Sequence, residues 1–478
     1  MEIMQGVKGE PKIVQTDIES QDGQNKCPRC GATDIALNAK TGLLRCNYCR
    51  YEFLPEKVKG LETNISEIRG EIIGSGAKDI DDSENQKSNV KTFKCSSCGA
   101  EVVIDGNETT QARCHWCRNT LSLNSQIPNG AIPDVLLPFK LTKEEAKTQI
   151  EEFVGKRKFY AHPKFKEEFS LDNIMGVYFP YMLVDVNGHA HFEGYGEHEV
   201  RKYFVRRGDN RELNYDADLY EIERDFDLSI QDISVESNSD RLNKENNEKT
   251  NNVINSIMPF DTENCVRYNA NYLKGYTSEK RDTNIEDLRK IVDVQSKDIS
   301  RFAANDTIKK YDRGVNWKKQ ELDVKGRQWK TAYLPVWLYS YQEKKENKSI
   351  MHYVAVNART KETMGSVPIH IPKLIGMSAL VELLGIILML IVDVSWSFLF
   401  VMLGFIYFLI VYLKYRNTNA RHHHEIETKR NIINLRQKDQ LIKHKTGLSN
   451  SKMVESNNME VTGQNVVGEM VNKFTNIL

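Results

Sequence analysis

The stretch CPRCGATDIALNAKTGLLRCNYC at residues 27–49 has a second copy, CSSCGAEVVIDGNETTQARCHWC, at residues 95–117. Each copy holds two Cys-x-x-Cys pairs separated by fifteen residues. Two such pairs supply four thiolates to one tetrahedral Zn²⁺. The predicted ligands are Cys27, Cys30, Cys46, Cys49, Cys95, Cys98, Cys114 and Cys117. Because four protein ligands leave no open position on the metal, we expect two structural zinc sites and not a catalytic one.

The residues between the paired cysteines predict a β-hairpin in each copy. In the second copy, Val102-Val103-Ile104 leads into Asp105-Gly106, which is a strong hairpin signal. In the first copy, Ile35-Ala36-Leu37 leads towards a turn in the same way. Alternating residues after the last cysteine of each copy add a third strand. We therefore expect two zinc ribbons, at residues 26–54 and 91–124.

Single residues around the cysteines refine this prediction. Gly31 and Gly99 follow the first Cys-x-x-Cys pair of their copies and suit a tight turn, because glycine tolerates positive φ. His115 could replace a cysteine as a ligand, but with four cysteines present we expect it at the surface. Cys265 has no partner pattern, so we expect a small buried hydrophobic residue there.

A disulfide framework is the alternative to zinc. It would require an oxidising compartment, yet residues 1–12 are polar and lack the apolar region of a signal peptide. The spacing therefore favours reduced cysteines that bind metal.

Residues 374–413 predict a helical hairpin in a membrane. These forty residues carry only two charged side chains, Glu382 and Asp393. Two spans, 374–392 and 395–413, fit a bilayer, with the turn at Asp393-Val394. Glu382 could pair across an oligomer, mark a polar pathway or simply be tolerated within an apolar helix.

The charges that flank this hairpin predict its orientation. Between Lys414 and Lys445 the chain has nine Lys or Arg residues and three acidic ones, whereas the turn has only Asp393. The positive-inside rule then places both long ends in the cytoplasm. We expect a multi-pass protein of the cell membrane with both termini cytoplasmic.

A β-rich domain with helices is expected between the ribbons and the hairpin. Thr142 and Glu145 form a capping-box signature at the start of a helix, and apolar spacing predicts another over about 284–304. Residues 177–184 predict a strand that turns at Asn187-Gly188 into His189–Phe192. The pattern Tyr-x-Pro-x-x-Leu of this strand recurs at residues 333–338, which suggests a duplicated β-hairpin unit.

The expected fold class is therefore multidomain α+β. Its expected segments are a disordered N-terminus (1–25), zinc ribbon 1 (26–54), a linker whose start could form a short helix (55–90), zinc ribbon 2 (91–124), a β-rich α+β domain with a duplicated hairpin (130–370), a two-helix transmembrane hairpin (374–413) and a basic, polar cytoplasmic tail with some helical periodicity (414–478).

Few other residues suggest chemistry. His189 and His191 alternate on one strand face, with Glu193 and His198 nearby, and could form a second metal or catalytic site; a polar sheet face is the simpler interpretation. His422-His423-His424 could bind metal weakly or respond to pH, and a solvated run beside the membrane is again simpler. No phosphate-binding loop, nucleophile elbow or dinucleotide fingerprint occurs, so we expect no enzyme and assign no catalytic residue.

Nucleic-acid binding is the main alternative to protein binding. Lys+Arg and Asp+Glu number 66 each, so net charge favours no particular partner. Ribbon 1 nevertheless combines basic residues with aromatic ones that could stack on bases. These residues are Lys26, Arg29, Lys40, Arg45, Arg50, Tyr48 and Tyr51.

The paired cysteine units resemble the TFIIB-type zinc ribbons of general transcription factors and of many bacterial proteins. The similarity extends to the bacterial TFIIB-type zinc-ribbon membrane proteins of Gram-positive organisms. The segments that carry it are Pro138–Ala146, Gly176–Tyr181, Pro259-Phe260-Asp261, Tyr333–Leu338 and the turn at Asn357–Gly365. This resemblance implies a membrane-anchored cytoplasmic module whose partners include phage-shock or band-7 (SPFH) envelope-stress proteins.

Two functional expectations follow. The first is a non-enzymatic membrane scaffold or sensor that recruits a cytoplasmic protein to the inner leaflet. The second is a membrane-tethered protein that binds nucleic acid or regulates transcription. An enzyme that uses His189, His191 and Glu193 is a more distant third.

Overall fold

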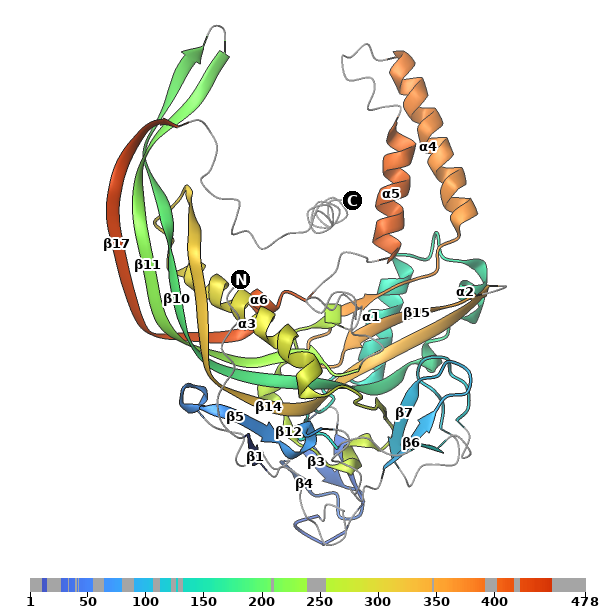
Figure 1. The fold of residues 1–478 in the computed structure, drawn as a ribbon. Helices are drawn as coiled ribbons and strands as arrows, with labels where there is room; N and C mark the ends of the chain where they lie inside the picture. Colours follow the sequence, from blue (N-terminus) through green and yellow to red (C-terminus); the bar gives the residue numbers. More distant parts are fainter. Residues whose placement is uncertain are drawn as a thin grey trace.

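The computed structural model describes residues 11–14, 27–32, 34–38, 41, 43–54, 64–79, 90–105, 112–121, 126–127, 132–207, 210–238, 255–345, 348–391, 402–416 and 422–448. Helices and strands are mixed and most strands join one large sheet, so the expected α+β class is confirmed (Figure 1). The main path of this sheet runs through β1 (Lys12–Val14), β5 (Gly70–Gly74), β14 (Gly314–Lys345), β10 (Met175–Arg207), β13 (Thr277–Glu279), β7 (Glu101–Asp105), β6 (Val90–Lys94) and β8 (Gln126–Ile127). Branching from it are β9 (Val135–Leu136), β11 (Asn210–Glu236), β12 (Val266–Arg267), β15 (Lys348–Asn357), β16 (Thr363–Gly365) and β17 (Lys429–Leu448). The helices are α1 (Lys143–Gly155), α2 (Pro163–Glu168), α3 (Ile285–Asp306), α4 (Ile371–Ile391), α5 (Leu403–Arg416) and α6 (His424–Glu427).

Four long strands in the order β17-β11-β10-β14 form a curved antiparallel extension of the sheet (Figure 1). Side chains alternate between its two faces, as the pleat requires. Ala190, Phe192 and Phe226 are buried on the face that α3 covers. The opposite face carries polar residues, including His189 and His191. This extension therefore has the apolar-in, polar-out pattern of an antiparallel sheet with one solvated face.

Helix α3 provides the core of that extension. Its N-terminus has a capping box in which Asn284 and Asp287 exchange side-chain-to-backbone hydrogen bonds. Leu288 and Val292 are fully buried, one helical turn apart. Both belong to the same core cluster as Trp329 of β14. The helix predicted from the apolar spacing at 284–304 is thus confirmed, as is the capping box of Thr142 and Glu145 at α1.

The two Tyr-x-Pro segments pair with each other at the centre of the sheet. Tyr178 lies opposite Pro335, Pro180 lies opposite Tyr333, and Phe179 and Leu334 form the pair between them. A short parallel strand flanks each segment, β13 beside β10 and β9 beside β14. Helix α1 begins eight residues after the first residue of β9, and α3 begins eight residues after the first residue of β13. Both helices have a capping box. The register is symmetric about the Phe179–Leu334 pair, so the two segments are related by a local pseudo-two-fold axis.

The predicted turn at Asn187-Gly188 is wrong, because β10 continues through both residues to Arg207. The Asn187 side chain is buried and donates hydrogen bonds to the carbonyl oxygens of Ser66 (2.9 Å) and Ile68 (3.0 Å). An Asn-Gly pair predicts a turn only when the asparagine is free to adopt left-handed geometry. Here the side-chain amide of Asn187 donates to carbonyl groups of a distant segment. Strand β10 does not turn, and only its register with β14 shifts at Gly188.

Parts of the expected linker and disordered N-terminus form strands in the large sheet. Of the short helix expected at residues 57–73, the described residues contain one 3₁₀ turn at Ile65–Glu67. Residues 70–74 instead form strand β5, which lies between β1 and β14. The Glu71 carboxylate accepts hydrogen bonds from Trp329 Nε1 (2.6 Å) and from Arg289 (2.7 Å). A buried carboxylate needs such partners, and these come from far along the chain. The polar composition of the expected linker therefore gave no indication of strand β5.

The tail also departs from its prediction. Instead of polar chain with helical periodicity, residues 429–448 form β17, which pairs with β11 along most of its length. Apolar residues such as Ile433 and Leu441 are exposed beside polar ones, and the strand pairing is interrupted by register shifts. These interruptions remove the regular period of two that would have marked a strand in the sequence.

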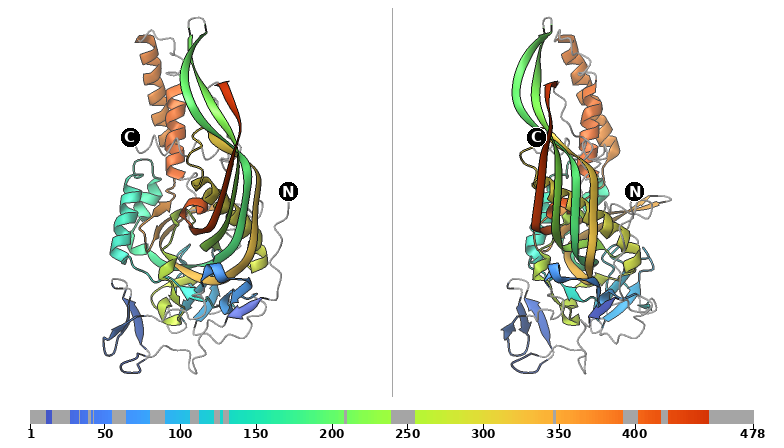
Figure 2. Two further views of the ribbon diagram at one scale, coloured as in Figure 1. Left: turned by 90° about the vertical axis from the view of Figure 1, so that its left-hand side faces the viewer. Right: turned by 60° about the vertical axis from the view of Figure 1, so that its left-hand side comes forward.

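Helices α4 and α5 run side by side and project from the body (Figures 1 and 2). One helix segment in the described residues, Ile371–Met389, is long and apolar enough to cross a membrane by length and composition. The second apolar helix, Leu403–Tyr415, is shorter. The predicted turn at Asp393-Val394 lies outside the described residues. The two-span hairpin is therefore a proposal that we take up below.

Glu382 has a role within this helix pair. Its carboxylate accepts a hydrogen bond from the backbone N–H of Gly404, at 2.7 Å. Gly404 lies in the first turn of α5, where backbone N–H groups have no partner within the helix. Glu382 therefore satisfies the N-terminus of α5, which the sequence alone did not indicate.

We expect Gly404→Val to separate α4 from α5. A Cβ at Gly404 would lie 2.4 Å from the carbonyl oxygen of Ser378 and 2.7 Å from Glu382 Cβ, so backbone must move. Overpacking of this kind costs about 1–3 kcal/mol. Thermal unfolding of the full chain in detergent should show the loss. The matched control is Gly376→Val, because a Cβ there meets nothing within 4 Å. Equal effects of the two substitutions would contradict the prediction.

Candidate metal centres

Ribbon 1 is a three-stranded sheet made of β2 (Ile35–Asn38), β3 (Leu43–Cys46) and β4 (Glu52–Phe53). Its hairpin places Ile35 opposite Cys46, so the two Cys-x-x-Cys turns lie at the same end. The hairpin of ribbon 1 thereby brings cysteines that are far apart in sequence to one point. In ribbon 2, β6 and β7 pair antiparallel on either side of the first Cys-x-x-Cys pair, and the return strand predicted after Asp105-Gly106 falls on residues 106–111, outside the described residues.

All four Cys-x-x-Cys turns share one backbone geometry. The carbonyl oxygen of the first cysteine accepts a hydrogen bond from the N–H four residues later, at 2.8–2.9 Å. That fifth residue has positive φ in every turn: Gly31 at 70°, Arg50 at 59°, Gly99 at 80° and Arg118 at 62°. The sequence predicted this for the two glycines and missed the two arginines, which carry a steric cost in the left-handed region.

The eight cysteines predicted as ligands form two groups of four. Within each group the sulfur atoms all lie within 4.8 Å of one another. The shorter separations are 3.6 Å for Cys27–Cys49 and Cys30–Cys46, 3.4 Å for Cys95–Cys117 and 3.6 Å for Cys98–Cys114. Four sulfurs at a Zn–S distance of about 2.3 Å in a tetrahedron lie about 3.8 Å apart. Each group thus fits one tetrahedral metal ion of its own.

Crowding of the thiols makes each group a suitable site for a cation. The hydrogen bond with Cys114 lowers the pKa of Cys98 to about 5. The same contact raises the pKa of Cys114, and burial raises it further. Four thiolates at this spacing repel one another unless a cation lies between them. The donor set therefore suits a soft or borderline dication such as Zn²⁺.

Ribbon 2 is joined to the large sheet. Strand β7 pairs with β13, with Ser278 opposite Val103. The buried Glu279 carboxylate lies 3.2 Å from His115 Nε2 and accepts a hydrogen bond from Trp116 Nε1. His115 Nδ1 lies 3.2 Å from Thr277 Oγ1. The expectation that His115 is a surface residue is thus wrong: it is 1% exposed and connects the metal-binding turn to the body.

Ribbon 1 packs against the body with fewer specific contacts. It forms a separate sheet, and its buried residues Ile35 and Leu44 join the same core cluster as α1. Lys274 Nζ lies 3.0 Å from Asp34 Oδ1, in a pair whose carboxylate is 62% exposed. Figure 2 shows this ribbon at the end of the body opposite the α4–α5 pair. The two centres are therefore attached to the protein in different ways.

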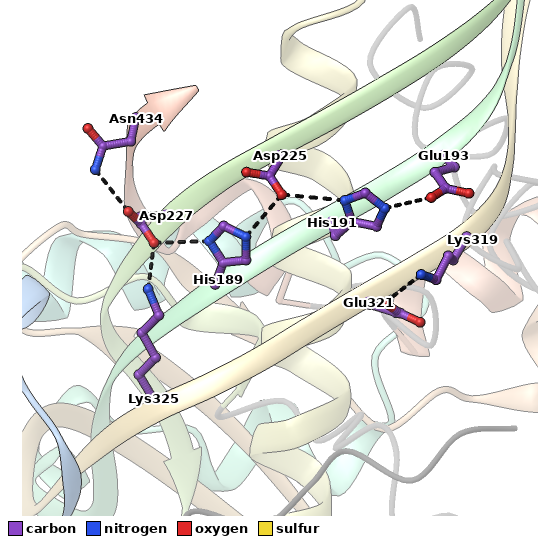
Figure 3. A network of polar contacts seen from close by, with 9 residues as sticks. All are labelled: His189, His191, Glu193, Asp225, Asp227, Lys319, Glu321, Lys325 and Asn434. Carbon is purple, nitrogen blue, oxygen red and sulfur yellow. Dashed lines mark hydrogen bonds and ion pairs between the residues drawn. The ribbon is translucent and has the colours of Figure 1, made fainter. Parts of the chain in front are cut away.

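Of the histidines named as a second candidate site, two come together (Figure 3). His189 lies between Asp227 and Asp225, with each ring nitrogen 3.1 Å from a carboxylate oxygen. His191 Nε2 lies 2.7 Å from Glu193, and its Nδ1 lies 3.4 Å from Asp225. His198 lies apart and contacts the carbonyl oxygen of Lys310.

This chain of alternating acids and bases continues across the sheet. Lys325 Nζ lies 2.6 Å from Asp227 Oδ1, and the Asn434 amide donates to its other oxygen. Hydrogen bonds from Lys325, Asn434 and His189 hold the pKa of Asp227 well below its ordinary value. Contact with His191 lowers the pKa of Glu193. Among the described residues only the two cysteine groups have three or more metal-type ligand atoms clustered closely enough for an ion. We therefore interpret the histidine cluster as an ion-pair network of the polar sheet face.

We expect this network to make stability fall in acid. A carboxyl group whose folded pKa is depressed stabilises the fold above its unfolded pKa, near 3.9, and loses that contribution as pH falls towards the folded value. Urea unfolding midpoints at about pH 6 and about pH 3 should differ less in Asp227→Asn than in the wild type. Asp323→Asn, at an exposed position of β14, is the control and should keep the wild-type dependence. An unchanged dependence in Asp227→Asn would refute the assignment.

The remaining candidates are structural. His424 is buried and lies 3.2 Å from Asp298 of α3, so the expectation of a solvated histidine run is wrong at this position. Cys265 is partly buried against the core, and burial raises the pKa of its thiol. Both observations describe packing contacts and not reactive groups.

The fold and the cysteine groups together define a class: an α+β protein with two four-cysteine groups that could each hold a metal ion and an exposed apolar helix pair. Comparison with protein-family models, with curated proteins and with solved structures finds no match for this chain.

Proposed function

We propose that this protein is a membrane-anchored scaffold or sensor that recruits a cytoplasmic protein to the inner leaflet. The observation that supports it best is the exposed apolar surface of α4. Leu380, Leu383 and Leu384 are each more than half exposed. A helix that is apolar on all sides and exposed to water is unfavourable unless lipid or protein covers it. A bilayer is the covering that its length suits.

In this proposal α4 and α5 insert as a hairpin and the rest of the chain stays cytoplasmic. Figures 1 and 2 show the free end of the β10–β11 hairpin projecting to the same side as α4 and α5. An open sheet edge cannot lie in hydrocarbon, because its backbone groups would lack partners. Insertion therefore requires the helix pair to tilt away from the strands about its junction with the body.

The metal in both centres is proposed to be Zn²⁺, held in ribbons of the TFIIB type. The four-sulfur donor sets and the shared turn geometry support this identity. In the proposed function the metals fold the ribbons, and the ribbons and sheet present surfaces to a partner.

Strand β17 supplies a surface suited to recruitment. In the described part of the chain it pairs only with β11, so its other edge is open along twenty residues. Exposed backbone edges accept an added strand from a partner. β17 carries Lys and Arg at 429, 430, 436, 438, 443 and 445 and a single acid, Asp439. Lys429, Arg430, Lys438 and Lys445 already pair with acids of the body, and Arg436 and Lys443 add positive charge that suits an acidic extended segment.

Membrane insertion is tested with lysines placed in α4. We expect the full chain to remain with lipid vesicles in a flotation assay after alkaline carbonate extraction. Leu383→Lys with Ile387→Lys should release it, because each charge costs about 2.5–3.5 kcal/mol at a helix centre. The matched control is Ile433→Lys with Leu441→Lys, which changes exposed apolar residues of β17 instead. Flotation of the α4 variant would contradict insertion.

Recruitment is tested by crosslinking from the β17 edge. A photo-reactive amino acid at Gln440, which is exposed, should crosslink to an acidic segment of a cytoplasmic protein. Charge reversal of Arg436, Lys438 and Lys443 should abolish this crosslink. Reversal of Lys158, Lys164 and Lys166, which are exposed elsewhere, should preserve it. Crosslinks that map to non-acidic segments, or that survive reversal in β17, would exclude this surface.

One observation favours nucleic-acid binding as the second candidate. On ribbon 1 the Tyr48 side chain is 82% exposed and Tyr51 is 41% exposed. The Arg29 guanidinium lies over the Tyr51 ring, 5.8 Å from its centroid. Exposed aromatic rings beside arginines are the surface that single-stranded nucleic acid stacks on. Fluorescence anisotropy with single-stranded DNA should then show binding that weakens with salt and is lost in Tyr48→Ala; no binding at low salt would exclude it.

A further inference from the structure

A cavity of 560 Å³ lies where both ribbons meet the body. Its wall includes Leu37 of ribbon 1, Arg113 and Arg118 of ribbon 2, and Met175 at the start of β10. Lys274 and the residues up to Thr277 complete it from the body. Volumes of about 300–1,000 Å³ are typical of sites for small molecules.

The charges in this wall are strongly unbalanced. Four basic side chains line the cavity, namely Arg113, Arg118, Lys143 and Lys274, against one acid, Asp172. The Asp172 carboxylate is 89% exposed and pairs with Lys147 at 3.3 Å, not with a basic residue of the wall. The excess positive charge of the wall would therefore attract an acidic group of a ligand.

The contacts of Lys143 and Arg118 leave the charge of both side chains available. Lys143 Nζ lies 3.5 Å from the backbone oxygen of Asp172, which carries no net charge. Arg118 donates to the carbonyl oxygen of Ser340 and lies over the Tyr339 ring, 5.0 Å from its centroid. These contacts fix Arg118 without neutralising it. Lys274 has a carboxylate partner, Asp34, at 3.0 Å. Because that carboxylate is 62% exposed, the ion pair is weak and a ligand anion can compete with Asp34 for the ammonium.

The remainder of the wall is apolar and aromatic. Leu37 and Ile104 contribute from the two ribbons, and Tyr276 and Trp337 contribute from the body. Tyr276 is held by stacking on Phe139, with ring centroids 4.3 Å apart. The wall thus combines cations with a fixed apolar surface, the mixture expected around a ligand that has both an acidic group and an apolar part.

We propose that this cavity binds a small organic anion, with its phosphate or carboxylate group on Arg113 and Lys274 and its apolar part against the aromatic wall. Arg113 precedes the metal ligand Cys114, and Leu37 lies in the hairpin of the other centre. The ligand therefore contacts both ribbons and the body together. A sensor role follows, since occupancy fixes the ribbons relative to the sheet. This site is independent of the β17 edge and of membrane insertion.

The test is isothermal titration of the full, metal-loaded chain in detergent with two pairs of probes. AMP and indole-3-acetate carry a phosphate and a carboxylate, and adenosine and indole-3-acetamide are their uncharged counterparts. We expect at least one anion to bind with a Kd of about 1 mM or tighter, and at least tenfold tighter than its counterpart. Which anion binds identifies the acidic group of the ligand.

Variants locate the binding. Arg113→Gln and Lys274→Gln should each weaken it by about tenfold while the metal content stays at two ions per chain, which shows that the ribbons remain folded. Arg206→Gln and Lys158→Gln, at exposed positions outside the cavity, should leave it unchanged. The proposal is overturned if neither anion binds, if charged and uncharged probes bind equally, if the cavity variants bind normally, or if only an acidic peptide such as oligoglutamate binds.

Discussion

Replacing Cys114 by serine is expected to lower the metal content from two ions to one per chain and to detach ribbon 2 from the large sheet. Structural zinc contributes about 10–16 kcal/mol of binding free energy in isolated modules of this size, so a centre with three thiolates no longer holds the turn closed. Because His115 and Trp116 follow Cys114 directly, their contacts with Glu279 are lost with the turn. The β7–β13 pairing then loses its support.

The same change in ribbon 1 provides the comparison. Cys46→Ser should also remove one metal ion, but in the described part of the chain ribbon 1 forms its own sheet and shares no strand pairing with the body. The body should therefore unfold at nearly the wild-type temperature in Cys46→Ser and at a clearly lower one in Cys114→Ser. Elemental analysis and differential scanning calorimetry measure the two effects. Cys265→Ser is the control and should keep both metal ions, since Cys265 belongs to neither group.

Two results would count against this account. Retention of two metal ions by Cys114→Ser would show that this residue is not a required ligand. Identical thermal transitions in the two ribbon variants would show that ribbon 2 is not coupled to the sheet through Glu279.

The two cysteine groups were predictable because their chemistry is local. A Cys-x-x-Cys pair determines its own turn, and the hairpin between the pairs of ribbon 1 requires only short-range alternation. The left-handed conformations of Arg50 and Arg118 were not predictable, because the sequence signal for positive φ is glycine. In the fold, these arginines are held by the same hydrogen bond that the glycines use.

The arrangement of the sheet was only partly predictable. The repeated Tyr-x-Pro pattern singled out two segments that pair with each other, Tyr178 opposite Pro335 and Pro180 opposite Tyr333, but it did not indicate that pairing. Strand β5 and the burial of His115 depend on partners more than 150 residues away, such as Trp329 for Glu71 and Glu279 for His115. Composition near β5 gives no sign of those partners, and the same holds for the pairing of β17 with β11.

The second large effect concerns Lys330, which no sequence pattern singled out. Its ammonium lies 3.0 Å from Asp185 Oδ2 and 2.7 Å from Asp232 Oδ1, and the three side chains are at most 14% exposed. Asp232 lies at an irregularity in β11 with φ of 52°, where its N–H donates to Asp185 at 2.8 Å. Lys330 thus neutralises two carboxylates that this irregularity brings together inside the sheet.

We expect Lys330→Met to lower the free energy of unfolding by about 3–5 kcal/mol, because it leaves two buried carboxylates without a counter-charge. Equilibrium urea unfolding measures this loss. Lys319→Met is the matched control: it lies on the same strand, its partner Glu321 is 3.0 Å away, and both side chains are about 40% exposed. Exposed pairs contribute about 0–1 kcal/mol, so the control should be nearly neutral.

The pH dependence of this defect distinguishes lost charge pairing from lost packing. Burial already raises the pKa of Asp185, and the ammonium of Lys330 opposes that rise. Without it, the pKa of both carboxyl groups should exceed the unfolded values. A group with a raised folded pKa destabilises the fold at high pH and ceases to do so as pH falls through that value. The Lys330→Met defect should therefore be smaller at about pH 5 than at about pH 8, and Asp185→Asn in the same chain should reduce it at pH 8. A defect of equal size at both pH values would mean that Lys330 acts through packing of its methylene groups and not through its charge.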